Sequence, residues 1–178
     1  MSVNETNEIL DLLEASRDSL NTAAANVDAS RAGLRPAADQ WSVLECIEHV
    51  TNVEGRFLAR LAEAEQLNEP RIDKEKEAAL AARVGRRVSK VQAPGAARPT
   101  GRFSNLEEAL ASFNSCRAQT LKFAAERAAD LYSLAIDHPR FGALNGVELL
   151  IVVASHTSRH AEQISETGAL AAAAGTLS

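Results

Sequence analysis

The chain has 178 residues, of which 46% are hydrophobic and only 4% aromatic, and its formal net charge at pH 7 is -5. This length and apolar content suit one domain with a sizeable core, and the alanine runs with only 9 glycines and 5 prolines favour helix over strand. The acidic balance excludes the basic surface with which proteins bind nucleic acid or an anionic membrane, so we expect neither as a partner.

The N-terminal stretch MSVNETNEILDLLEASRD lacks the basic region, apolar run and cleavage site of a secretory signal. The longest apolar stretch, VELLIVVA, is far shorter than the roughly 20 residues of a membrane span. We therefore expect a cytoplasmic protein. Cys46 and Cys116 form no CxxC pair, which excludes a disulfide framework and a four-cysteine zinc site, and both are expected to be buried.

The first helix is predicted from about Asn4 to about Val27. Its buried face repeats at the i, i+3, i+4 spacing of a helix that packs on one side. The residues of this face are Ile9, Leu12, Leu13, Ser16 and Leu20. The segment RAGLRPAADQ follows and ends the helix.

Three later helices, predicted over 42–65, 104–130 and 145–168, each begin with a capping box, a Ser or Asn followed three residues later by Glu. The boxes are Ser42 with Glu45, Ser104 with Glu107 and Asn145 with Glu148. Two of these helices also carry a hydrophobic staple, which pairs Trp41 with Cys46 and Leu144 with Leu149.

A long crossover, from about 69 to 103, joins the second and third helices. Its charged first part, PRIDKEKEAALAARVGRR, suits a short helix, whereas Pro94, Gly95, Pro99 and Gly101 exclude regular structure after it. A connection of about 35 residues is long enough to join the two helices as parallel neighbours.

These elements predict an all-α fold, a four-helix bundle with a long crossover between its second and third helices. Residues 1–170 are expected to form a single domain. The closing residues 171–178 are expected to form a flexible tail.

Two of the four histidines, His156 and His160, lie four positions apart in an apolar stripe of the last helix. At about 100° per residue they are about 40° apart, so both belong to the core seam. A buried imidazole without a partner costs about 1 to 3 kcal/mol. The spacing lets one helix supply two metal ligands. Two hydrogen-bonded core histidines fit the same spacing, which alone favours neither interpretation.

A third ligand has to come from another helix, and His49 is the obvious candidate, since only His138 otherwise remains. His49 lies at the border of its apolar face, which suits the mouth of a cleft but also an exposed histidine. A di-iron carboxylate bundle requires Glu three residues before His, and a zincin requires HExxH. No histidine here has such a glutamate, and Thr157 stands in its place in HTSRH. Three neutral nitrogens suit zinc or nickel, and also copper or iron, with an open coordination position.

Several motifs occur in a fixed order along the chain. They are Trp41-Ser42 with His49 seven residues after the serine, APGAARPTGRF in the crossover, HPRFGALNGVELL, and the group His156, Arg159, His160, Gln163 and Ile164. In this order they resemble the DinB/YfiT-like superfamily of bacterial four-helix-bundle proteins, over most of the chain. The resemblance implies a three-histidine metal site formed by His49, His156 and His160.

Other residues near the predicted ligands have more than one interpretation. Glu45 lies about 40° from His49 and suits a fourth ligand or a general base, although its capping role accounts for it. Gln163 is in line with His156 and can hydrogen-bond a ligand or a bound water. Trp41 is the staple residue, and the family places it near the site. Cys46 offers a thiolate, but its position is apolar in the family.

The remaining polar residues of this region are expected to lie outside the ligand set. Arg159 either pairs with a substrate carboxylate or a glutamate such as Glu48, or is solvated, which is the simpler case. His138 is not generally a ligand in the family, so we expect it to pack in a loop or beside the site. Ser155 and Thr157 are expected to be helix filler.

Family members include metal-dependent hydrolases and enzymes that use low-molecular-weight thiols. The resemblance therefore implies a hydrolase or a thiol transferase that depends on a divalent metal ion and acts on a small molecule. The alternative is a non-catalytic metal-binding or stress-response bundle that holds a small ligand. Family members are commonly dimers, so a homodimer is expected. The sequence assigns neither catalytic residues nor a substrate.

Overall fold

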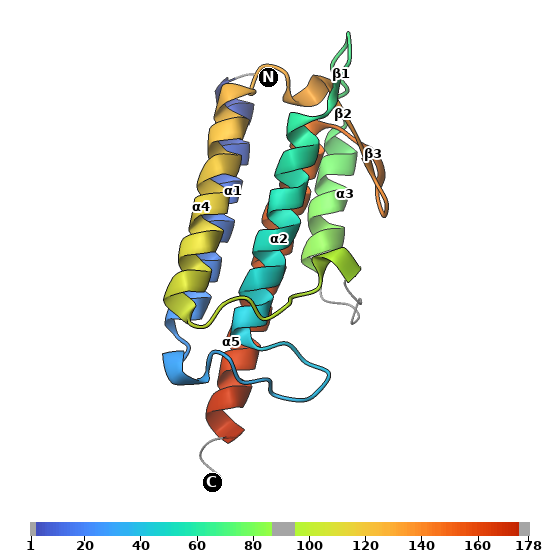
Figure 1. The fold of residues 1–178 in the computed structure, drawn as a ribbon. Coiled ribbons are helices and arrows are strands. Elements are labelled where there is room, and N and C mark those ends of the chain that lie inside the picture. Colours follow the sequence, from blue (N-terminus) through green and yellow to red (C-terminus); the bar gives the residue numbers. More distant parts are fainter. Residues whose placement is uncertain (1–2, 87–94, 175–178) are drawn as a thin grey trace.

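The computed structural model describes residues 3–86 and 95–174. Its four long helices, α1 (Val3–Ala25), α2 (Val43–Ala62), α4 (Leu106–Glu126) and α5 (Gly146–Ala174), form an elongated bundle (Figure 1). The predicted four-helix bundle is confirmed. Within the described ranges, no helix is long and apolar enough to cross a membrane.

The long helices pack in the cyclic order α1, α5, α2, α4. α2 and α4 run in the same direction, and α1 and α5 run in the opposite direction (Figure 1). The neighbours α2 and α4 are therefore parallel, as the length of the crossover predicted. α2 faces α5 in the antiparallel sense, which places residues early in α2 beside residues in the middle of α5.

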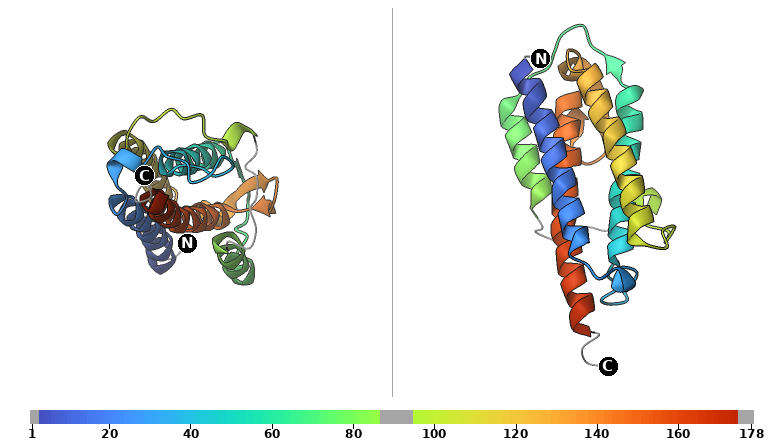
Figure 2. Two further views of the ribbon diagram at one scale, coloured as in Figure 1. Left: turned by 90° about the horizontal axis from the view of Figure 1, so that it is seen from below. Right: turned by 90° about the vertical axis from the view of Figure 1, so that its left-hand side faces the viewer.

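The crossover begins with the short helix α3 (Lys74–Gly85), which packs against α5 outside the four long helices (Figure 2). Asp73 caps α3 by accepting a hydrogen bond from the backbone N–H of Lys76. Pro94 lies outside the described residues. A single turn of 3-10 helix, η2 (Gly95–Ala97), is followed by a segment without regular structure that leads to α4. The short helix agrees with the sequence, whereas the turn η2 lies where regular structure was predicted to be absent. A single turn needs only the hydrogen bond from Arg98 N–H to the Gly95 carbonyl, which Pro99 does not prevent.

A small antiparallel sheet, which was not predicted, lies at one end of the bundle (Figure 1). It consists of β1 (Glu65–Gln66), β2 (Leu134–His138) and β3 (Gly142–Leu144), in that order. Ile136 stands opposite Leu144, and both are buried. Segments of two to five residues are too short to show a period-2 pattern in the sequence.

Two of the predicted capping boxes are present. In the first, Glu45 N–H donates to Ser42 Oγ and Ser42 N–H donates to Glu45 Oε2; Asn145 and Glu148 exchange the same pair of bonds at α5. The third prediction was wrong by one residue, because α4 is capped by Asn105, which accepts from Glu108 N–H. Ser104 lies outside the helix, where its backbone N–H and its hydroxyl both donate to Glu108 Oε2.

Three details of burial and length differ from expectation. Leu12 was predicted to be buried but is 38% exposed, because it lies about 100° from the buried Leu13 and outside the arc of α1 that α4 and α5 cover. Cys46 is buried as predicted, whereas Cys116 is only partly buried, because it lines an open groove between α2 and α4. α5 continues to Ala174, four residues into the predicted tail, and residues 175–178 lie outside the described part.

A buried arginine on α4 connects all four long helices. Arg117 is 0% exposed and donates five hydrogen bonds, one for each of its N–H groups. Its acceptors are the Leu13 carbonyl and Ser16 Oγ of α1, both carboxylate oxygens of Glu54 of α2, and Thr157 Oγ1 of α5. Thr157 is therefore not helix filler, since it binds Arg117 from the turn that separates the two histidines of α5.

Candidate metal centre

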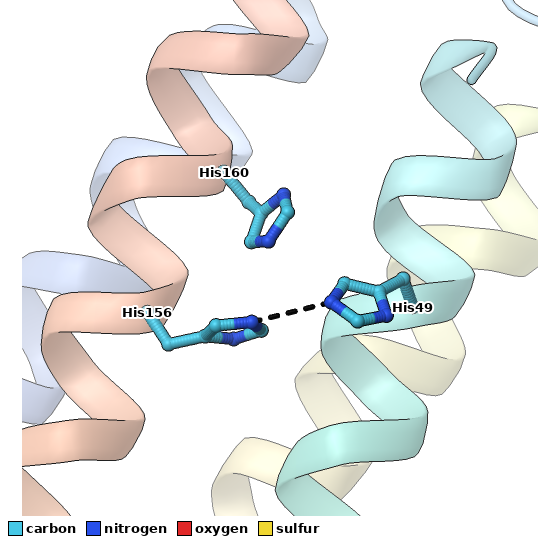
Figure 3. Close-up of side chains that lie close together, drawn as sticks. All are labelled: His49, His156 and His160. Carbon is cyan, nitrogen blue, oxygen red and sulfur yellow. Dashed lines mark hydrogen bonds between the residues drawn. The ribbon is translucent and has the colours of Figure 1, made fainter. Parts of the chain in front are cut away.

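Three histidines face one another across the interface between α2 and α5 (Figure 3). His49 comes from α2, and His156 and His160 come from successive turns of α5. Each offers one ligand atom, and these three atoms all lie within 4.8 Å of one another. The Nε2 atoms of His49 and His156 are 3.2 Å apart. The structure thus brings together the three residues that were predicted to bind metal.

The site is shielded from solvent on most sides. His49 and His160 are 5% and 6% exposed, whereas His156 is partly exposed. Trp41, the residue before the N-cap of α2, lies over two of the rings. Its ring centroid is 4.8 Å from that of His49 and 6.4 Å from that of His160. Trp41 forms an apolar wall of the site, near which the family resemblance placed it.

A backbone carbonyl of the crossover fixes the proton of His49. Nδ1 of His49 is 2.6 Å from the carbonyl oxygen of Ala97 in η2. Because a carbonyl only accepts, the neutral ring carries its proton on Nδ1 and leaves a lone pair on Nε2, directed at His156. Metal-binding histidines are generally oriented in this way by a second group.

All three imidazoles are held in the neutral form. Burial lowers the pKa of His49 and Arg159 lowers it further, against the hydrogen bond to Ala97. Burial, the His49 ring and Arg159 together lower the pKa of His156 to about 3. Burial and the neighbouring His156 and His49 rings lower the pKa of His160 well below its usual value. Neutral imidazole is the form that binds a metal ion.

The donor set fits a divalent transition-metal ion. A tetrahedral ion with metal–nitrogen bonds of about 2.0 to 2.1 Å separates its ligand nitrogens by about 3.3 Å. The two Nε2 atoms of His49 and His156 lie close to that separation, at 3.2 Å. In addition, Nδ1 of His160 is buried and has no hydrogen-bond partner in the described structure. An unsatisfied buried nitrogen is unfavourable by about 1 to 3 kcal/mol, so this ring needs a further ligand or partner.

Among the residues expected beside the ligands, Gln163 lies close enough to His160 to raise the pKa of the ring, which opposes the effect of burial. Arg159 lies close enough to lower the pKa of all three histidines. It is partly buried, which differs from a fully solvated arginine.

Both glutamates near His49 are engaged elsewhere. Glu45 completes the cap of α2 and forms a bidentate ion pair with Arg35. Burial raises its pKa, but Arg35 and Ser42 outweigh burial, and the pKa lies below its usual range. Glu48, which was considered as a partner of Arg159, accepts its hydrogen bonds from residues 100–102 of the crossover. Glu45 therefore acts as a cap, and neither carboxylate is placed as a ligand.

The other two candidates lie outside the cluster. Among the described residues, the group that can hold a metal ion consists only of the three histidines, without His138 or Cys46. His138 sits in the β2–β3 hairpin, where its Nδ1 accepts hydrogen bonds from the backbone N–H groups of Arg140 and Phe141. Its ring lies against Phe57 and Phe141. It packs in the loop, which was one of the two expected roles.

Two contributions were missed from the sequence. Ala97 acts through its backbone oxygen, and the sequence has no signal for a carbonyl that faces an imidazole. Thr157 was assigned no role because its partner Arg117 is distant in the chain. A signal did exist for Glu48, since a glutamate beside a predicted ligand on a buried helix requires hydrogen bonds from another segment.

The comparisons with known proteins concern the family and the fold of the chain. The model of the DinB superfamily matches residues 12–164, a range that contains the three histidines. A search of curated proteins found no match. The chain is similar to TT2238, described as a four-helix bundle protein, with 25% identity, 90% of this chain and 98% of that chain covered, and a TM-score of 0.60.

A second similar structure is YfiT from Bacillus subtilis. It is described as a probable metal-dependent hydrolase with an unusual four-helix bundle topology. The two chains are 16% identical, the match covers 98% of this chain and 90% of YfiT, and the TM-score is 0.58. At this identity the likeness concerns the fold.

Proposed function

Because this chain belongs to the DinB superfamily, we propose that it is a divalent-metal-dependent enzyme whose ion is bound by His49, His156 and His160. The observation that carries the proposal is the convergence of three neutral imidazoles from two helices, with one of them oriented by the Ala97 carbonyl. Zinc and nickel are the ions that we propose, since both accept imidazole nitrogens.

Hydrolysis is the reaction that we favour. A divalent ion with an open coordination position activates water or a thiol and polarises an electrophilic group. The description of YfiT, which shares this fold, as a probable metal-dependent hydrolase supports the same reaction class. In this chain, the Trp41 ring keeps bulk water away from His49 and His160, and the Ala97 carbonyl holds the proton of His49 away from Nε2.

One observation favours thiol transfer as the second candidate. Glu45 and Glu48, the glutamates within about one turn of His49, are bound to Arg35 and to the crossover, so neither is free to act as a general base. A free thiol has a pKa of about 8.5 and loses its proton far more readily than water does. A low-molecular-weight thiol is therefore a nucleophile that this site accommodates without a protein base.

Metal analysis of the untagged protein tests the proposal. We expect one zinc or nickel ion per chain after loading, and a loss of binding by at least tenfold in His49→Ala and in His160→Ala. His138→Ala is the matched control, because it removes the same ring from the β2–β3 hairpin and should bind metal like the wild type. Failure of the wild type to bind zinc or nickel, or equal losses in all three variants, would contradict the proposal.

Activity then separates the remaining alternatives. The loaded protein is assayed for hydrolysis of nitrophenyl esters and amides, and for conjugation of a small thiol to monochlorobimane. Turnover that disappears in His160→Ala identifies the reaction class. A protein that binds metal with no turnover in either assay is instead the non-catalytic, ligand-holding bundle. The expected homodimer, small-molecule substrate and cytoplasmic location stay predictions.

A further inference from the structure

Glu48 is a buried carboxylate next to a candidate ligand, and its hydrogen-bond donors among the described residues lie in the crossover. It is 1% exposed. Oε1 accepts from the backbone N–H and the hydroxyl of Thr100, both at 2.8 Å, and Oε2 accepts from the backbone N–H groups of Gly101 at 2.9 Å and Arg102 at 3.1 Å. Burial raises the pKa of Glu48, but these bonds outweigh burial and lower the pKa below its usual value.

The backbone of residues 100–102 is shaped around this carboxylate. Three consecutive N–H groups point at it, which requires an unusual chain conformation, and Gly101 supplies that conformation with a φ of 77°. L side chains rarely adopt this φ. Charge-assisted hydrogen bonds of this kind are roughly twice as strong as neutral ones, so the segment is held firmly against α2.

The same segment orients a candidate ligand. Ala97 lies three residues before Thr100, and its carbonyl oxygen is 2.6 Å from Nδ1 of His49. The crossover is therefore attached to α2 at two consecutive residues, by a carboxylate anchor at Glu48 and by a carbonyl contact at His49.

We infer that Glu48 is a positioning residue of the metal centre, which anchors Thr100–Arg102 so that the Ala97 carbonyl keeps the proton of His49 on Nδ1 and its Nε2 free for the ion. This inference rests on the proposed function. Glu48 itself is not a ligand, because both of its oxygens are bound to the crossover. Loss of such an orienting partner typically weakens metal binding 10- to 100-fold.

The test compares two glutamates of α2. Glu48→Gln replaces a carboxylate oxygen by an amide group that cannot accept from the crossover. Glu45→Gln is the matched control, since Glu45 is also buried and lies on the same helix, one turn before His49, but is bound to Ser42 and Arg35. Zinc affinity is measured by competition with a chromophoric chelator, and the tautomer of His49 by the nitrogen chemical shifts of its ring in zinc-free protein.

We expect Glu48→Gln to bind zinc about 10- to 100-fold more weakly and to shift His49 from the single Nδ1–H tautomer to a mixture. Glu45→Gln should keep the tautomer. The inference is overturned if folded Glu48→Gln keeps both the affinity and the tautomer, or if Glu45→Gln changes them equally.

A milder variant keeps the test decisive if Glu48→Gln does not fold. Thr100→Val removes one donor to Glu48 and retains the carboxylate, so a several-fold weaker affinity for zinc and a partial tautomer change are expected, and no change in either overturns the inference. The tautomer measurement needs no metal. A wild-type protein that binds no zinc therefore contradicts the proposed function alone, while an unchanged tautomer contradicts the role of Glu48.

Discussion

The three histidines of the candidate centre link the stability of the protein to pH. Their pKa values in the folded state lie below the usual value of 6.5, and for His156 at about 3. Below pH 6.5 the unfolded chain therefore binds more protons than the folded one. The contribution of the three neutral histidines to the free energy of unfolding is fully present above pH 6.5, and it decreases as the pH falls towards the folded pKa values.

We expect the metal-free protein to lose stability below pH 6.5 more steeply than His160→Gln does. Glutamine does not titrate, so the difference between the two free energies of unfolding should change by up to about 1.4 kcal/mol per pH unit as the pH falls below 6.5. Urea denaturation of both proteins with a chelator present measures this difference. Parallel pH profiles would show that His160 is not held neutral in the folded state.

The ligand residues were predictable, whereas the groups that orient them were not. His156 and His160 were found from their spacing on an apolar stripe, and His49 from the small number of remaining histidines. The capping box with Ser42 identified Glu45 as the cap of α2, but the sequence could not show which segment supplies the donors for Glu48, three positions later. That assignment depends on where residues 100–102 lie in space.

At the level of helices and strands, the start of α4 shows why a capping motif can be correct and still misplaced by one residue. The stretch SNLEE contains two overlapping boxes, Ser104 with Glu107 and Asn105 with Glu108. The structure uses the second. The choice depends on how the chain enters α4 from the crossover, and a local pattern carries no information about that direction.

Substitution of both candidate caps distinguishes them. We expect Asn105→Ala to lower the free energy of unfolding by about 1 kcal/mol, because the first turn of α4 loses the acceptor for Glu108 N–H. Ser104→Ala should cost less, since Ser104 lies outside the helix and its hydroxyl bonds to the side chains of Glu108 and Asn105. The measurement is urea denaturation at pH 7. A larger loss in Ser104→Ala would reassign the cap to that residue.

The molecule as a whole is organised around a polar group that the sequence did not indicate. Hydrophobic periodicity predicted the helices, because burial of apolar stripes depends on spacing alone, and the length of the crossover predicted the parallel pair. An arginine inside the bundle contradicts that pattern, and it is tolerated because every N–H group of Arg117 finds an acceptor on α1, α2 or α5. Partners so far apart in the chain cannot be matched before the fold is known.

Removing Arg117 alone should lower the free energy of unfolding far more than removing both members of the Arg117–Glu54 ion pair. We expect Arg117→Ala to cost about 3 to 5 kcal/mol, because the Glu54 carboxylate is left buried without its partner. The double variant Arg117→Met with Glu54→Leu should recover most of this loss. Arg56→Met is the control, since Arg56 is exposed on α2 and surface changes stay within about 0.5 kcal/mol. A double variant as unstable as Arg117→Ala would contradict the explanation.

The five bonds of Arg117 also determine how far each helix is allowed to shift along its own axis. When one helix shifts by one turn, about 5.4 Å, its apolar stripe meets the neighbouring helix in nearly the same packing arrangement. If the stripe is rich in alanine, the two arrangements differ little in packing energy. A hydrogen bond does not survive such a displacement. Arg117 therefore fixes the axial position of α5 relative to α2, because it binds Thr157 of one helix and Glu54 of the other. His156 and His160, which flank Thr157, are held opposite α2 in the same way. For the double variant Arg117→Met with Glu54→Leu we expect a stability similar to that of the wild type, but NMR signals of the histidine rings that are broadened by exchange between axial positions of the helices. Sharp, single ring signals would show that apolar packing alone fixes the axial position.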